Sequence, residues 1–390
     1  MFLERLRTLF SETQSTHLRQ RLAAAGLDGE RLESLDQLAA LPVLRKDDLR
    51  QIQAAQRPFG GLLGVPLHQL ARIFQSPGPI YDPQGHGADY WGWRDAFAAA
   101  GFMPGDIAMV CFSYHLTPAG QMFDDGARAL GCVTIPAGIG NQEQQQMALL
   151  HTGATAYIGL PSYLKALLDK SARQNVPLSL RKAFVCAEPL PTSLRQSLEA
   201  GGMSVQQGYG TADLGCVAYE CGFKDGMHLR EGLLVQICDP ASEQPLPAGE
   251  VGEIVVTTLN PVYPMVRFGT GDLSALSHEP CGCGRSSPRL LGIRGRVGQG
   301  IKVRGLFVYP HQLAAVFAEL PQVVAWSGLI TRDNHRDDLT VLIDAPEDQE
   351  LLNTLAARLQ AALKLNCAVR VVEPGSLAEA APLQDDRVWA

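Results

Sequence analysis

Two glycine-rich turns carry the side chains best suited to chemistry in this sequence. The turn at 208–213 presents the ring of Tyr209, the hydroxyl of Thr211 and the carboxylate of Asp213, and the turn at 269–272 ends on Asp272. Carboxylates in such turns can bind Mg²⁺ or a ribose diol, and a nucleotide can approach the nearby backbone. Turn aspartates are more often only solvated, so these motifs alone leave both interpretations open.

Soft metal ligands are interleaved with these turns. Cys221 and His228 follow the first turn, and Cys281 and Cys283 follow the second. Three thiolates and one imidazole complete a tetrahedral zinc site. Such a set leaves no position for water, which predicts a structural ion rather than a catalytic one. On spacing alone, unrelated free cysteines are an equally good alternative, and Cys216 competes for the role of Cys221.

The composition excludes several classes of protein. A chain of 390 residues with 46% hydrophobic residues predicts a globular protein of about two or three domains. A net charge of −7 argues against nucleic-acid and membrane-surface partners. No apolar run approaches the ~20 residues of a membrane helix, and residues 1–12 do not resemble a secretory signal. We therefore expect a cytoplasmic protein in which most of the nine cysteines are reduced core residues.

Alternating strands and helices are expected to position the first turn. From 106 to 211, apolar strand-like runs alternate with helical ones, which predicts a parallel, doubly wound sheet. Ligands bind beyond the carboxyl ends of the strands in such sheets. Three segments lie at predicted strand ends: 113–120, 186–189 and 208–213. Tyr114 and His115 in the first segment could line a pocket, although a single histidine is more often structural.

The flanking segments have a different character. Residues 1–60 predict helices, with Lys46 and Asp47 at a helix start, where capping chemistry is the preferred interpretation. A strand is expected at 72–74, followed by a turn-rich loop at 75–87. After 228, β-rich runs predict a small antiparallel unit, and the glycine-rich stretch at 292–305 predicts a hinge. A small α+β domain is expected beyond it.

Most of the chain resembles the phenylacetate–CoA ligase family of adenylate-forming, AMP-binding enzymes. LPVLRKDDLR at 41–50 is similar to that family's N-terminal lead-in, and GCVTIPAG, LPSYLKAL and CAEPLP are similar to its sheet segments. GYGTAD resembles the family's aromatic-Gly-x-Ser/Thr-Glu motif, and FGTGDL resembles its ribose-binding motif. GRVGQGIKVRGLFVYPHQL resembles its hinge and the start of its lid domain. The three cysteines and the histidine fall on zinc ligands of some members.

The resemblance implies an α/β fold in two domains. Residues 1–297 would form a large N-terminal domain of doubly wound, mostly parallel sheets with a small β-rich unit, and the zinc site would be inserted around 216–285. Residues 298–390 would form a small α+β lid domain. The implied enzyme is an acid–thiol ligase that uses ATP and Mg²⁺ to convert a small carboxylic acid to an acyl-adenylate and then to an acyl-CoA. An acyl carrier protein and a second copy of the chain are further possible partners.

The resemblance also assigns site residues, motif by motif. Thr211 would meet the AMP phosphate and Asp213 would hold Mg²⁺, as the catalytic pair. Asp272 would bind the ribose hydroxyls, and Arg296 would lie just before the hinge. The adenine would be framed by Ala187, Glu188, Pro189, Tyr209 and Gly210. An acyl pocket would be bordered by Tyr114, His115, Pro136, Ala137 and Gly138.

Four positions depart from the family pattern. The phosphate loop should end on a lysine but reads QSPGPIYDPQG, in which Pro77 and Pro79 remove backbone donors. The motif glutamate is Asp213, the hinge aspartate position holds Gly298, and no lysine follows Lys364. Phosphate donors and a lid lysine stabilise the adenylation transition state. Two alternatives therefore stay open: an acyltransferase between CoA and a carrier thiol that no longer adenylates, and a non-catalytic acyl- or nucleotide-binding protein.

Overall fold

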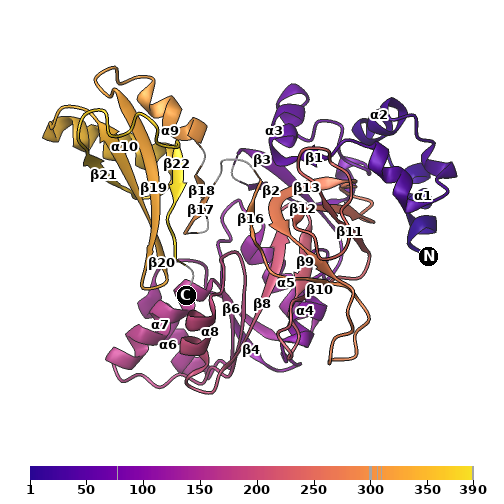
Figure 1. Ribbon diagram of the computed structural model, residues 1–390. Helices are drawn as coiled ribbons and strands as arrows, with labels where there is room; N and C mark the ends of the chain where they lie inside the picture. Colours follow the sequence, from indigo (N-terminus) through magenta and orange to yellow (C-terminus); the bar gives the residue numbers. More distant parts are fainter. Residues whose placement is uncertain (77, 298–300, 305, 309, 389–390) are drawn as a thin grey trace. The chain divides into compact units, whose positions relative to one another are not determined.

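A computed structural model of the protein describes residues 1–76, 78–297, 301–304, 306–308 and 310–388 (Figure 1). The chain divides into two compact units, one of Met1–Leu190 with Arg195–Gly295 and the other of Pro191–Leu194 with Arg296–Ala390. Two sequence positions singled out above, Pro77 of the phosphate loop and Gly298 of the hinge, lie outside the described residues. Among the helices that are described, none has the length and apolarity that a membrane crossing requires.

The largest sheet of the first unit is parallel on one side and antiparallel on the other. Its parallel strands, in spatial order, are β8 (Ser204–Thr211), β7 (Lys182–Val185), β6 (Ala156–Gly159), β4 (Ile107–Cys111) and β5 (Val133–Pro136). Beyond β8 the sheet continues through β9 (Gly215–Tyr219), β10 (Met227–Leu229), β15 (Arg289–Leu290) and β14 (Leu276–Ser277), all antiparallel to their neighbours. The predicted α/β fold with a parallel sheet is confirmed.

Continuous burial explains why these runs form parallel strands. Every residue of β6 is buried, and in β4 only Ile107 is partly exposed, as expected for strands covered on both faces. The core beside them is aromatic: Trp93 lies 4.5 Å from Phe123, and Phe112 stacks on Phe123 at 4.5 Å between ring centroids. The helices that alternate with the strands are α4 (Arg94–Ala99), α5 (Ala119–Ala129), α6 (Gln142–Thr152), α7 (Pro161–Arg173) and α8 (Thr192–Glu199).

A second sheet joins the N-terminal segment to residues more than two hundred positions later. Its order is β1 (Leu44–Arg45), β13 (Phe268–Ser274), β12 (Gly252–Thr258) and β11 (Leu233–Cys238). The pairing of β1 with β13 is parallel, and the other pairings are antiparallel. The antiparallel part was predicted after residue 228, whereas the participation of β1 was not. The helical elements before β2 are α1 (Phe2–Glu12), α2 (Thr16–Ala24), η1 (Gly29–Arg31), η2 (Leu35–Ala40), α3 (Lys46–Ala55) and η3 (Leu67–Gln69).

A two-stranded hairpin replaces much of the turn-rich loop predicted at 75–87. Strands β2 (Leu70–Ser76) and β3 (Ile80–Gly85) pair in an antiparallel register that includes Phe74 with Asp82 and Ile73 with Pro83. The sequence prediction was wrong here because proline disfavours a strand. Each strand of a two-stranded sheet has one unpaired edge, so a proline without an N–H group is tolerated.

The second unit is an α+β domain built on the sheet order β21-β20-β19-β22. Leucines at 351, 355, 359 and 363 form the buried face of its long helix. The short strand β22 pairs in parallel with β19 and was missed, because three residues after a proline carry no periodic signal. The short strand β16 (Gly295–Arg296) comes first in the chain and pairs with β13 in the second sheet described above. The elements of the α+β domain are β17 (Ile301–Val303), β18 (Leu306–Val308), α9 (Pro310–Phe317), β19 (Ala325–Asp333), β20 (Arg336–Asp344), α10 (Gln349–Leu363), β21 (Ala368–Val371) and β22 (Leu383–Asp385).

Candidate functional site

Two of the predicted site residues are joined by a hydrogen bond. The hydroxyl of Tyr209, near the end of β8, donates to Oδ2 of Asp272 in β13 at 2.8 Å. The two residues come from different sheets of the first unit. Tyr209 is buried, so its hydroxyl fixes the direction of a carboxylate that is only partly buried. This arrangement orients an acceptor group at the edge of the parallel sheet.

A bulge in β13 directs Asp272 to this position. In the pairing with β12, Gly269 lies opposite Val255 and Leu273 lies opposite Glu253, so three residues of β13 face one residue of β12. Gly271 in the bulge has a φ of 74°, which glycine adopts readily. The predicted glycine turn is therefore a bulge inside a strand. Thr270 closes it, because its hydroxyl donates to the Ile254 carbonyl at 3.0 Å and accepts from the Asp272 N–H at 3.2 Å.

The connection from β8 to β9 holds Thr211 and Asp213 in a tight turn. Thr211 Oγ1 accepts a hydrogen bond from the Leu214 N–H at 3.2 Å, which satisfies a turn donor. A Cβ atom at Gly210 would lie 2.2 Å from the Gly215 carbonyl oxygen, so only glycine fits at that position. The turn leaves the Asp213 side chain 1% exposed.

Lys46 and Asp82 accompany Asp213, and neither was predicted as a site residue. Lys46 is the first residue of α3, and its Nζ lies 3.1 Å from Asp213 Oδ2. The register of β1 with β13, in which Arg45 lies opposite Gly269, places Lys46 next to the bulge. The N-terminus of α3 is also capped, because Asp48 Oδ2 accepts a hydrogen bond from the Arg45 N–H at 2.7 Å. The helix does begin at Lys46, but the capping carboxylate is that of Asp48 rather than the expected Asp47, and the ion pair of Lys46 was not predicted.

Asp82 in β3 is an ionisable group in an unfavourable environment. It is 0% exposed, and hydrogen bonding from Ser76 only partly offsets the cost of burying its charge. Burial, followed by the negative charge of Asp213, raises the pKa of Asp82 to about 7, although Lys46 opposes the shift. The hydroxyl of nearby Ser76 is directed to the Ile80 carbonyl at 3.5 Å. No local sequence signal marks this residue, because its neighbours come from distant segments.

The predicted adenine frame follows a strand adjacent to β8. Val185 of β7 pairs with Gln207 of β8, so residues 187–189, which follow β7, and residues 209–211, which end β8, lie toward the same end of the parallel strands. Ala187 has a φ of 70°, which is uncommon for a residue with a side chain and is found often at functional sites. The Glu188 carboxylate accepts a hydrogen bond from Ser162 Oγ at 2.6 Å, at the start of α7.

The predicted acyl-pocket residues follow β4 and β5, which are also adjacent parallel strands. Val110 of β4 pairs with Pro136, and its carbonyl accepts hydrogen bonds from the N–H groups of Ala137 and Gly138, both at 3.1 Å. Tyr114 is partly buried and its hydroxyl donates to Asp124 Oδ1 at 3.5 Å, while His115 is exposed. The last predicted residue, Arg296, lies in β16 where the chain enters the second unit.

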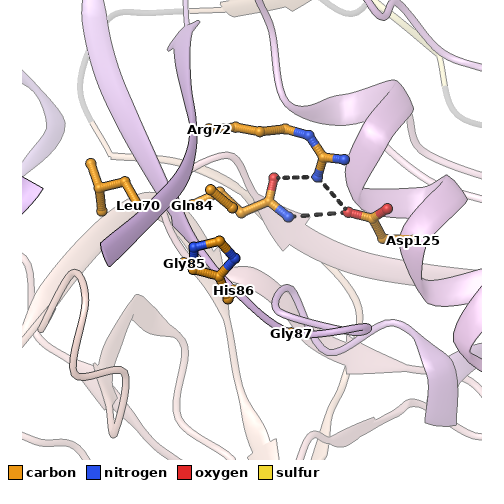
Figure 2. Close-up of a pocket in the computed structure, with 8 residues that line it drawn as sticks. Leu70, Arg72, Gln84, Gly85, His86, Gly87 and Asp125 are labelled. Atoms are coloured by element: carbon orange, nitrogen blue, oxygen red, sulfur yellow. Dashed lines mark hydrogen bonds and ion pairs between the residues drawn. The ribbon is translucent and has the colours of Figure 1, made fainter. Parts of the chain in front are cut away.

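A separate polar pocket lies at the other end of the β2–β3 hairpin. Its volume is about 310 Å³, and Figure 2 shows Arg72, Gln84 and Asp125 directed toward one another with His86 beside them. Arg72 Nη1 donates to Gln84 Oε1 at 3.2 Å and to Asp125 Oδ2 at 3.1 Å, and Gln84 Nε2 donates to the same carboxylate oxygen at 3.1 Å. The three side chains largely satisfy one another, and the pocket contains none of the predicted nucleotide residues.

The four predicted metal ligands lie together on the antiparallel side of the large sheet. Cys221 follows β9, His228 lies in β10, and Cys281 and Cys283 lie between β14 and β15. Their ligand atoms are all within 4.8 Å of one another. The Cys221 and Cys281 sulfurs are 3.7 Å apart, close to the about 3.8 Å expected for two Zn–S bonds of about 2.3 Å at a tetrahedral angle. Cys216 lies in the aromatic core and is not part of the group.

The protonation states in this cluster suit metal binding. Burial lowers the pKa of His228, which favours the neutral imidazole, and its Nδ1 lies 3.0 Å from Ser287 Oγ while Nε2 lies 3.3 Å from Cys283 Sγ. Desolvation opposes ionisation of Cys283, but hydrogen bonds from Arg285 contribute to lowering the pKa of this thiol to about 7. Buried Arg289 ties the two ligand loops together, since it donates to the Glu279 carbonyl at 3.1 Å and binds Asp225.

The cation that the sequence places in the C-terminal tail is used structurally. Arg387 Nη1 donates to Asp337 Oδ2 and to the Lys302 carbonyl, both at 2.9 Å, and its Nε donates to Asp385 Oδ1 at 2.7 Å. Asp337 also binds Arg332 at 2.7 Å. The Arg387 side chain is 8% exposed. This network anchors the tail to the domain rather than presenting a guanidinium to a substrate.

The sequence is similar to AMP-binding enzymes over both units. The AMP-binding enzyme family matches residues 128–261, and the AMP-binding enzyme C-terminal domain matches residues 305–388. Phenylacetate-coenzyme A ligase of Thermus thermophilus is 32% identical over 346 residues, which cover 84% of this chain and 77% of that protein. The phenylacetate-coenzyme A ligase of Aromatoleum evansii is 30% identical over 388 residues, with 92% and 86% covered.

A solved structure extends the similarity to the fold. The structure of 2-hydroxyisobutyryl-CoA ligase, in complex with 2-HIB-AMP and CoA in the thioesterification state, matches with a TM-score of 0.90 and 25% identity. The match covers 99% of this chain and 89% of that one. Together with the sequence relatives and the orientation of Tyr209 and Asp272, it shows that this chain belongs to the phenylacetate–CoA ligase family of AMP-binding enzymes.

Proposed function

We propose that this protein is an acyl- or aryl-CoA ligase that binds an adenine nucleotide at the edge of its parallel sheet and uses a small carboxylic acid and CoA. The observation that carries the proposal is the 2.8 Å bond from Tyr209 to Asp272. An oriented carboxylate accepts hydrogen bonds from two neighbouring ribose hydroxyls. Residues 187–189 and Gly210, on the adjoining strands, would frame the adenine.

Thr211 and Asp213 would act at the phosphates. Asp213 Oδ1 is buried and accepts no hydrogen bond within the described residues. This oxygen could therefore coordinate a bound cation. When present, Mg²⁺ would neutralise charge on the phosphate oxygens. Tyr114, His115 and residues 136–138, beyond β4 and β5, would border the acyl group of the acid. Arg296 is assigned to the nucleotide by the family motif alone.

A second candidate function is favoured by the tail. With Arg387 buried in an ion network and no lysine after Lys364, the described tail offers little charge to the adenylation step. Transfer of an acyl group between CoA and a carrier thiol needs no such charge. Consumption of an acyl-CoA only when an acyl carrier protein is supplied, without ATP, would support this second candidate.

The cysteines bear on the location of the protein. The described residues include all nine cysteines, and no disulfide bond joins any two of them. Thiols persist in a reducing compartment, so we propose that the protein acts in the cytoplasm. The cluster of Cys221, His228, Cys281 and Cys283 is proposed to hold one structural zinc ion, supported by its closed ligand set.

Metal analysis tests the zinc proposal. Protein purified without added zinc should contain about one ion per chain, because structural sites of this type bind zinc tightly. Cys283→Ser should lose the ion and lower the midpoint of thermal unfolding. Cys216→Ser, outside the cluster, is the matched control and should keep the metal. A well-folded wild-type protein free of metal would end the proposal.

Calorimetric titration with AMP tests the nucleotide site. Asp272→Ala should weaken binding at least tenfold, or about 1.4 kcal/mol, because the acceptor for the ribose hydroxyls is removed. Tyr209→Phe should weaken binding less, since the carboxylate remains and loses only its orienting hydroxyl. Asp125→Ala, in the separate pocket, should bind AMP like the wild type. Unchanged affinity in Asp272→Ala would exclude the assigned role.

A further inference from the structure

The first turn of α7 holds the adenine loop, residues 187–189, which follows the neighbouring strand β7. Ser162 Oγ donates to Glu188 Oε2 at 2.6 Å, and the Ser162 N–H donates to the same oxygen at 3.4 Å. Hydrogen bonds to a carboxylate are stronger than those to a neutral acceptor. A carboxylate is also favoured at the N-terminus of a helix, where backbone N–H groups lack partners within the helix. Glu188 therefore caps α7 from outside, and α7 fixes Glu188 in return.

The adenine loop needs this support because its backbone is strained. Ala187 has a φ of 70°, and a residue with a Cβ atom adopts this conformation only at a cost in free energy. Such a residue persists where neighbouring contacts hold it in place. Before Ala187, the Cys186 N–H donates to the Gly159 carbonyl at 3.2 Å. After Ala187, the bond between Ser162 and Glu188 holds the chain, so the strained residue lies between two fixed points.

Ser162 is itself placed by a buried tyrosine. Tyr157 of β6 is 0% exposed, and its hydroxyl donates to the Leu160 carbonyl at 3.0 Å, directly before α7 begins. Gly159 makes room for this contact, because a Cβ atom there would lie 2.2 Å from the Tyr157 hydroxyl oxygen. The connection from β6 to α7 is therefore held from within the core. Its fixed position lets Ser162 act as an anchor for the adenine loop.

We propose that Ser162 is a positioning residue of the nucleotide site, which acts through Glu188 to hold the adenine loop in its binding conformation. The inference rests on the proposed function and extends it to a residue to which the family motifs give no role. A loop that is already ordered does not have to be ordered when the nucleotide binds. Loss of this preorganisation should weaken the binding of an adenine nucleotide by about two- to tenfold.

Calorimetric titration with AMP, together with an NMR titration with ribose 5-phosphate, tests the proposal. Ser162→Ala should weaken AMP binding by this factor and leave the affinity for ribose 5-phosphate unchanged, because that ligand has no base. Ser162→Thr keeps the hydroxyl and should restore AMP binding. Glu188→Ala should also weaken AMP binding. Adding Ser162→Ala to Glu188→Ala should have no further effect, because the serine then has no carboxylate to hold.

Ser171→Ala is the matched control, because it makes the same change further along the same helix. Ser171 Oγ accepts from Gln146 Nε2 at 3.0 Å and donates to the Leu167 carbonyl at 2.9 Å, so this variant reports a general effect on α7 and should bind AMP like the wild type. Unchanged AMP affinity in Ser162→Ala, or an equal loss for ribose 5-phosphate, would overturn this inference alone. A wild-type protein that binds no AMP would overturn the proposed function, and this inference with it.

Discussion

Replacing Gln384 with lysine should raise ATP–pyrophosphate exchange by about 10²–10³-fold, from a near-background rate in the wild type. The family resemblance implies a lysine in the lid tail that contacts the two oxygens that gain negative charge during adenylation. One preorganised donor of this kind typically contributes that factor. The tail of this chain has no lysine, and its Arg387 is held by Asp337 and Asp385.

The register of β22 selects Gln384 over its neighbour. Leu383 lies opposite Gly328, where a Cβ atom would be 2.6 Å from the leucine side chain, so Leu383 packs closely on β19. Lysine at 383 would lose that packing. Successive strand residues point to opposite faces, so Gln384 points away from this contact. Gln384→Met is the control of similar length, and its exchange should stay at the wild-type level.

Exchange should be assayed with phenylacetate, benzoate and short fatty acids. Brisk exchange by the wild-type protein would contradict the expectation and show that another cation supplies the charge. Arg304 is an unsuitable substitute, because its guanidinium binds Asp338 and donates to the Asp337 carbonyl at 2.6 Å. Lys302→Met would then identify whether the lysine near the hinge is responsible. Loss of exchange in that variant alone would assign the role to Lys302.

Asp82→Asn should stabilise the protein at neutral and alkaline pH by up to about 4 kcal/mol. The pKa of Asp82 is raised from 3.8 to about 7, and each tenfold difference in proton affinity between the folded and unfolded chain is worth about 1.4 kcal/mol. In the unfolded chain this carboxyl loses its proton near pH 4, whereas the folded protein retains the proton until about pH 7. The contribution of this carboxyl to stability is therefore highest below pH 4 and falls as the pH rises from about 4 to about 7. Above pH 7 the folded protein contains the buried carboxylate, and the contribution no longer changes.

Chemical denaturation between pH 5 and 8, in buffer without added divalent cations, measures this effect. The free energy of unfolding of the variant minus that of the wild type should increase by about 1.4 kcal/mol per pH unit below pH 7 and then level off. Taking the difference cancels the titration of His17 and His228, whose pKa values are lowered by burial. Asp125→Asn should give a difference that does not change over this range. A pH-independent difference for Asp82→Asn would show that burial does not raise this pKa.

The sequence predicted the parallel strands because their signal is local, whereas the grouping of the three cysteines with the histidine was favoured over free cysteines only by the family resemblance. A run such as 107–111 is apolar throughout, and the Cys-Gly-Cys spacing at 281–283 brings two thiols close together. It did not reveal Lys46 or Asp82, because these charges meet Asp213 only after two sheets and a hairpin have assembled. The bulge at Gly271 was predicted as a turn, since both conformations require a glycine with positive φ.

The pairing of β1 with β13 also determines when the site can form during synthesis. Leu44 pairs with Phe268, so the N-terminal segment must wait for about 220 further residues to leave the ribosome. At about 5–20 residues per second this delay is roughly 10–45 s. Throughout that interval Leu44, which is buried in the folded protein, lacks its partner strand. A nascent chain released before β13 is complete would expose this segment to chaperones and proteases, before Lys46 can meet Asp213.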